Sequence, residues 1–290
     1  MTAIKEGFIP FKGYQTYYRI VGECRDGKKP LLALHGGPGC AHDYLESLDP
    51  IADCGRAVVY YDQIGCGRSV TPSMPDFWSA ELFEEELAVV REALKLDEVH
   101  ILGQSWGGML AMQYATHRPK GVRSMVVASS PSDMDLWLKE ARRLRGYLPT
   151  EMQEALLQAD EDGDYERPEV VAASDEYYRR HVLSIPQPDF VKRSMDQMGE
   201  VYMVMQGASE FVVTGKLKEW NITDDLKNIE IPTLLTSGSC DEATPLIQKT
   251  IYDRIPDCRW ELIPDGTHMC HVEFPELYNA IVEAFLEQHD

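Results

Sequence analysis

Short runs of apolar residues alternate with segments of helical spacing over most of the chain. Continuous apolar runs of this kind are typical of strands that are buried on both faces of a sheet. They lie at residues 30–36, 57–62, 99–105, 122–130, 231–239 and 259–265, and an alternating strand pattern lies at 14–21. Because helical segments separate these runs, the pattern predicts a mostly parallel sheet with helices on both faces.

The apolar residues between the runs recur at the spacing of one helix face. The clearest stripes are Phe83, Leu87, Val90 and Leu94 in one segment, and Leu277, Ile281 and Phe285 in the last. The strand–helix alternation lapses between about 131 and 225, where the chain is helical in character and acidic in the middle. We therefore expect an α/β core at 1–130 and 226–290, and a mostly helical cap at 131–225.

Composition narrows the function classes. The 290 residues carry a net charge of −20, from 28 Lys and Arg against 48 Asp and Glu, which argues against nucleic acids and anionic membranes as partners. Seven cysteines without a CxxC pair argue against a disulfide framework or a zinc ribbon and favour a reducing compartment. Without a signal-type segment or a long apolar run, the sequence predicts a cytoplasmic protein.

The segment "GQSWG" (103–107) matches the G-x-S-x-G pattern of a nucleophile elbow. It follows an apolar run and precedes a helical segment, and this strand–turn–helix context makes an incidental serine the weaker interpretation. Ser105 is the predicted nucleophile. The helix that starts behind it would favour developing negative charge.

A second glycine-rich loop, "HGGPG" (35–39), follows another predicted strand. Acyl transfer on a serine requires two N–H groups directed at the oxygen that becomes negative. We expect Trp106 to supply one of them and Gly37 the other, because Pro38 has no N–H. The alternative interpretation of this loop is an ordinary strand-to-loop turn.

The acid and the base are expected late in the chain, in the order serine, acid, histidine. Asp241 follows the run 231–239, and His268 follows the last predicted strand. Asp241 would hold the His268 tautomer and stabilise the imidazolium. His271 is a rival base, but it should already enter the final helix. The eight histidines form no metal-binding pattern, and no cofactor is expected.

Four segments occur in an order that resembles the proline iminopeptidase family of α/β-hydrolase-fold aminopeptidases and amino acid amidases. They are "HGGPG", "YYDQIGCGRS" (60–69), "GQSWGG" and "SCDEATP" (239–245). The resemblance covers nearly the whole chain. It implies an α/β-hydrolase fold with an eight-stranded, mostly parallel sheet, a helical cap, and a triad of Ser105, Asp241 and His268.

The resemblance also implies two glutamates that hold the free α-ammonium of the substrate. One follows the triad aspartate and is Glu242; the other lies in a cap segment and is Glu210. Ser209 precedes Glu210 where the family has asparagine. Glu242 could instead be an acid near a helix N-terminus, and Glu210 an exposed cap residue.

The predicted function is therefore a serine aminopeptidase or amino acid amidase that releases proline or hydrophobic residues from short peptides or amides. The main alternative is a carboxylesterase with the same triad and no need for a free amine. A non-catalytic binding protein on the same fold is a third hypothesis. The sequence fixes neither the side-chain preference nor the oligomeric state.

Overall fold

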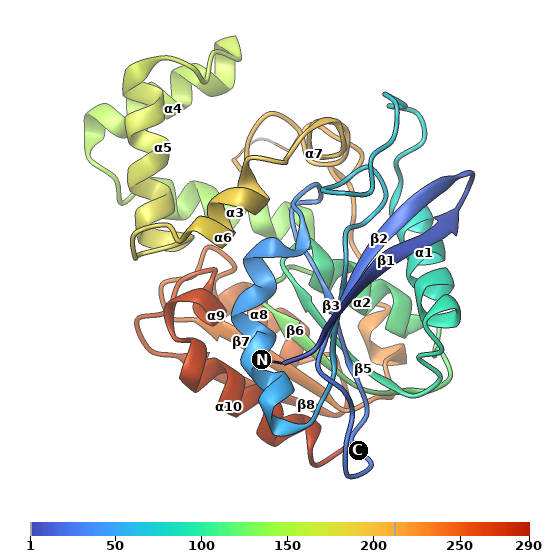
Figure 1. Ribbon diagram of the computed structural model, residues 1–290. Coiled ribbons are helices and arrows are strands. Elements are labelled where there is room, and N and C mark those ends of the chain that lie inside the picture. Colours follow the sequence, from blue (N-terminus) through green and yellow to red (C-terminus); the bar gives the residue numbers. More distant parts are fainter. Residues whose placement is uncertain (1, 212) are drawn as a thin grey trace.

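A computed structural model describes residues 2–211 and 213–290 of the chain (Figure 1). Its centre is one eight-stranded sheet with the strand order β1-β2-β4-β3-β5-β6-β7-β8. The strands are β1 (Ile4–Phe11), β2 (Tyr14–Val21), β3 (Leu31–Leu34), β4 (Val58–Tyr61), β5 (Val99–Gln104), β6 (Val122–Ala128), β7 (Thr233–Gly238) and β8 (Cys258–Ile263). The β1–β2 and β2–β4 pairs are antiparallel and the others are parallel, which confirms the predicted α/β-hydrolase fold.

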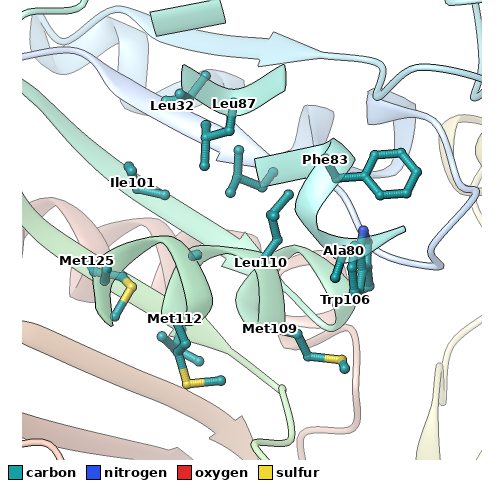
Figure 2. Close-up of a cluster of buried hydrophobic side chains, with 14 of the residues drawn as sticks. Leu32, Ala80, Phe83, Leu87, Ile101, Trp106, Met109, Leu110, Met112 and Met125 are labelled. Carbon is teal, nitrogen blue, oxygen red and sulfur yellow. The ribbon is translucent and has the colours of Figure 1, made fainter. Parts of the chain in front are cut away.

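Helices cover both faces of the sheet. The core helices are η1 (His42–Cys54, a 3₁₀ segment), α1 (Ala80–Ala93), α2 (Trp106–Thr116), η2 (Leu226–Asn228), α8 (Pro245–Tyr252), α9 (Cys270–Glu273) and α10 (Pro275–Leu286). Neighbouring strand residues point to opposite faces, so Leu32 packs with α1 and α2 while Leu31 packs with η1 and α10. Figure 2 shows the first of these clusters, in which Leu32 and Ile101 of the sheet lie near Leu87 and Leu110 of the helices. Burial on both faces is why these strands read as continuous apolar runs.

Five helices lie between β6 and η2, beyond the carboxyl ends of the parallel strands (Figure 1). They are α3 (Met134–Arg145), α4 (Thr150–Asp162), α5 (Pro168–His181), α6 (Asp189–Met195) and α7 (Glu200–Met205). A separate apolar cluster around Leu156, Val170 and Tyr177 joins α4 and α5. These helices therefore have a small core of their own above the sheet edge.

Two details differ from the sequence predictions. The edge strand Ile4–Phe11 was not expected, because Gly7 and Pro10 interrupt its apolar pattern; an edge position tolerates such residues. In α10 the predicted stripe is also wrong in part, since Leu277 is 49% exposed and the buried face runs through Tyr278 and Val282. No helix among the described residues is both long and apolar enough to cross a bilayer.

Candidate active site

The predicted site residues gather at the carboxyl edge of the sheet. A cavity of about 650 Å³, within the usual size range of ligand pockets, is lined by Gly37, Ser105, Glu210, Glu242 and His268. These residues come from four loops and from the turn after β5. Gly37 and His268 are separated by more than 230 residues in the sequence, so it is the fold that brings the five residues together.

Ser105 sits on a strained turn between β5 and α2. Its backbone angles are φ 56° and ψ −122°, a conformation that costs energy for a residue with a side chain. The flanking glycines make the turn possible: a Cβ on Gly103 would lie 2.1 Å from the Gly107 oxygen, and one on Gly107 would lie 2.1 Å from the Leu34 oxygen. The spacing of the motif is therefore dictated by close backbone packing around Ser105.

Gly37 and Trp106 lie beside Ser105. All three line a second, smaller cavity that adjoins the first. Trp106 is the first residue of α2, so its N–H has no partner inside the helix. Within residues 2–211 and 213–290, neither this N–H nor that of Gly37 donates a hydrogen bond to the protein. Both donors are free for a substrate oxygen.

The motif "DQIGCGRS" holds these donors in place. The Gln63 side chain accepts a hydrogen bond from Trp106 Nε1 at 2.8 Å and donates one to the His35 carbonyl at 2.9 Å. It thereby joins the residue after the nucleophile to the loop that carries Gly37. The Trp106 ring packs edge-on against the ring of Phe83, with the ring centroids 5.7 Å apart. Both side chains are labelled in Figure 2.

Asp241 and His268 form a buried pair. Asp241 follows β7, His268 follows β8, and His268 Nδ1 lies 3.0 Å from Asp241 Oδ1. Asp241 Oδ1 also accepts the Ala243 N–H at 2.7 Å, which fixes the carboxylate. The indole of Trp137 packs edge-on against the imidazole, with the ring centroids 6.0 Å apart. The imidazole is thus held in one orientation.

The ε nitrogen of His268 faces the cavity. Among the described residues it makes no hydrogen bond to Ser105 Oγ, and it lies 3.9 Å from Glu242 Oε1. Burial alone would lower the pKa of His268, but the attraction of Asp241, followed by Glu242 and Glu210, outweighs it and raises the pKa to about 9. The surrounding carboxyl groups therefore favour the charged form of the ring.

Glu210 and Glu242 both line the cavity, and among the described residues neither forms a salt bridge with a lysine or an arginine. Burial raises the pKa of Glu242 to about 8 and also raises the pKa of Glu210. Glu210 Oε1 accepts a hydrogen bond from the Tyr202 hydroxyl at 2.5 Å. Glu242 Oε2 is buried and has no hydrogen-bond partner among the described residues. Two carboxyl groups in such surroundings fit a small cationic ligand.

Other titratable clusters do not compete with this site. His271, the rival base, is buried against the Ser47 hydroxyl at 2.9 Å, and burial lowers its pKa to about 3. The described residues contain no group of three or more His, Cys, Asp or Glu side chains that could hold a metal ion.

Three site residues were not predicted from the sequence: Tyr202, Trp137 and Gln104. Tyr202 and Trp137 come from the helices above the sheet, and no motif marks them. Gln104 occupies the variable position before the nucleophile, and its amide donates to the His268 carbonyl at 3.1 Å. Its place in the elbow motif was the only available signal.

Comparison with known proteins gives a consistent result. The family model of the alpha/beta hydrolase fold matches residues 29–275. A relative named proline iminopeptidase from Clostridium botulinum strain Hall is 45% identical over 99% of both chains. A protein of the same name from Clostridioides difficile strain 630 is also 45% identical, again over 99% of both chains. The crystal structure of proline iminopeptidase from Mycobacterium smegmatis matches with a TM-score of 0.93 and 37% identity, over 98% of both chains.

Proposed function

The chain belongs to the proline iminopeptidase family of α/β hydrolases, and from this membership we propose how its site removes the N-terminal residue of a peptide. It is a serine hydrolase of the aminopeptidase class. The observation that carries the proposed mechanism is the pair of glutamates, Glu210 and Glu242, on the same cavity wall as Ser105 and His268.

In the proposed reaction, Ser105 Oγ attacks the carbonyl carbon of the N-terminal residue. His268 Nε2 accepts the serine proton, while Asp241 holds the ring and stabilises the imidazolium. The N–H groups of Gly37 and Trp106 donate to the oxyanion. His268 then protonates the departing amine, and a water molecule, activated by the same histidine, hydrolyses the acyl-enzyme.

Glu210 and Glu242 bind the free α-ammonium in this proposal. An aminopeptidase must recognise a positive charge at a short, fixed distance from the scissile carbonyl. The unpartnered Oε2 of Glu242 and the hydroxyl-anchored carboxyl of Glu210 supply acceptors for it. Hydrogen bonds to charged groups contribute about 1.5–3 kcal/mol each.

We propose short peptides or amino acid amides with N-terminal proline or hydrophobic residues as substrates. The relatives' name supports proline, and the cavity has apolar walls that include Leu183, Val191 and Met195. Residues 131–225 would act as a cap that limits peptide length, over a core of 1–130 and 226–290. A cytoplasmic location fits the seven free cysteines.

Substitution of Asp241 or of its neighbour Glu242 separates the orientation of the base from the binding of the ammonium. Asp241→Asn should lose about 10⁴-fold in kcat on every substrate, because the base loses its orienting partner. Glu242→Gln should lower kcat/KM about 10- to 150-fold on prolyl anilide, the effect of one lost charge-assisted hydrogen bond. Steady-state kinetics on prolyl anilide and on an uncharged phenyl ester measure both effects.

The ester is the internal control, because it has no ammonium to bind. Glu242→Gln should hydrolyse the ester at least as fast as the wild-type enzyme. Equal losses on both substrates for the two variants would contradict the division of roles between Asp241 and Glu242.

A further inference from the structure

The helix α5 ends against the two loops that carry the acid and the base. The backbone carbonyl of His181, the last residue of α5, accepts the Glu242 N–H at 3.2 Å and the His268 N–H at 3.0 Å. Carbonyl groups in the last turn of a helix have no partner inside the helix. Here one such group bonds the residue after Asp241 and the base itself.

The side chain of His181 forms a third bond to the same region. Its Nδ1 lies 2.8 Å from the Cys240 carbonyl oxygen. Because a carbonyl can only accept, Nδ1 carries the proton and donates it. Burial lowers the pKa of His181, so the ring is neutral at pH 7. His181 thus contacts the residues on both sides of Asp241.

Residues 182–184, which follow His181, extend this seam of hydrogen bonds between the end of α5 and the loop that carries His268. The Val182 carbonyl accepts the Met269 N–H at 3.0 Å and the Thr267 hydroxyl at 2.8 Å. Glu273 accepts the Ser184 N–H at 2.7 Å through Oε1 and the Thr267 N–H at 2.7 Å through Oε2. The chain that follows α5 is therefore hydrogen-bonded along its length to the loop that carries His268.

We propose that His181 is a positioning residue that fixes the acid loop relative to the base loop and so makes the cap part of the catalytic machinery. His181 is not among the residues that line the cavity, so it does not act by touching substrate. The inference rests on the proposed triad of Ser105, Asp241 and His268. Errors of about 1 Å in such a constellation can cost about 10²-fold in rate.

The test uses His181→Ala and His181→Asn in the full chain. Alanine removes the bond to Cys240, whereas the asparagine amide can place an N–H near the position of Nδ1. For His181→Ala we expect kcat on prolyl anilide to fall about 10- to 100-fold, with KM within about twofold of wild type. Labelling of Ser105 by a fluorophosphonate should slow by a similar factor, and His181→Asn should recover most of both rates.

His117→Ala is the matched control, because this histidine is exposed at the far end of α2. It should keep the wild-type rates. A rise in KM alone for His181→Ala, or labelling at the wild-type rate, would overturn the positioning role.

If His181→Ala does not fold, Thr267→Val tests the same seam by removing the hydroxyl bond to Val182, and it should lower kcat and the labelling rate together. Wild-type rates in a folded Thr267→Val would then overturn the proposal. A wild-type enzyme that neither labels nor cleaves prolyl anilide would contradict the proposed function itself.

Discussion

At the scale of single residues, three carboxyl groups act on one imidazole. Asp241 bonds His268 Nδ1, Glu242 lies 3.9 Å from Nε2, and Glu210, which lines the same cavity, adds a smaller attraction. The charged ring that they favour cannot accept the proton of Ser105. A substrate ammonium between the two glutamates would offset their charge and release the base. We therefore expect substrate binding and activation of the base to be linked.

This linkage predicts a pH dependence for the labelling of Ser105 by a fluorophosphonate, which carries no ammonium. Labelling needs a neutral His268, and the raised pKa keeps the ring charged until about pH 9, so the rate should rise towards that pH. Glu242 carries its negative charge above its own raised pKa of about 8, and Glu242→Gln removes that charge, which lowers the pKa of His268 and moves the rise to lower pH. Between about pH 8 and 9, where Glu242 is charged in the wild-type enzyme, this variant should label faster than wild type.

The exposed acid Glu151 offers a control for the loss of charge alone. Glu151→Gln should keep the wild-type profile. A Glu242→Gln profile that coincides with that of wild type would show that Glu242 does not act on the base.

At the scale of elements, the elbow between β5 and α2 depends on close contact with β3. A methyl group on Gly107 would lie 2.1 Å from the Leu34 oxygen, so Gly107→Ala must displace α2 or the strand. We expect the free energy of unfolding to fall by at least about 1–3 kcal/mol. Urea unfolding measures this change.

Gly146→Ala is the control for that substitution. Gly146 ends α3 in a helical conformation, with the nearest atom at 3.2 Å from an added Cβ. The free energy of unfolding of the Gly146→Ala variant should differ little from that of the wild-type protein. A Gly107→Ala protein as stable as Gly146→Ala would contradict the packing described for the elbow.

The elements that bear motifs were predictable, because buried parallel strands are continuous apolar runs and their loops carry Gly37, Ser105, Asp241 and His268. The edge strand β1 was not, because exposure on its outer side removes the apolar signal. The buried face of α10 was misplaced, since Leu277 is apolar yet exposed. Periodicity identifies a helix more reliably than it identifies which of two adjacent stripes is buried.

At the scale of the whole molecule, the helices above the sheet complete the site. Trp137, His181 and Tyr202 contact His268, its loop or Glu210, and each lies in a different helix of the segment 131–225. None carries a sequence signal, because their contacts depend on how that segment folds back over the strand ends. The family resemblance supplied Glu210, whereas its tyrosine partner required the structure.

In the proposed function, the site acts on peptides through recognition of a free α-ammonium. The most direct test is the ratio of kcat/KM for prolyl anilide and its N-acetylated form with the wild-type enzyme. Two charge-assisted hydrogen bonds predict that acetylation lowers kcat/KM by at least about 10²-fold. Equal cleavage of the two anilides would contradict the claim and indicate an esterase-type hydrolase.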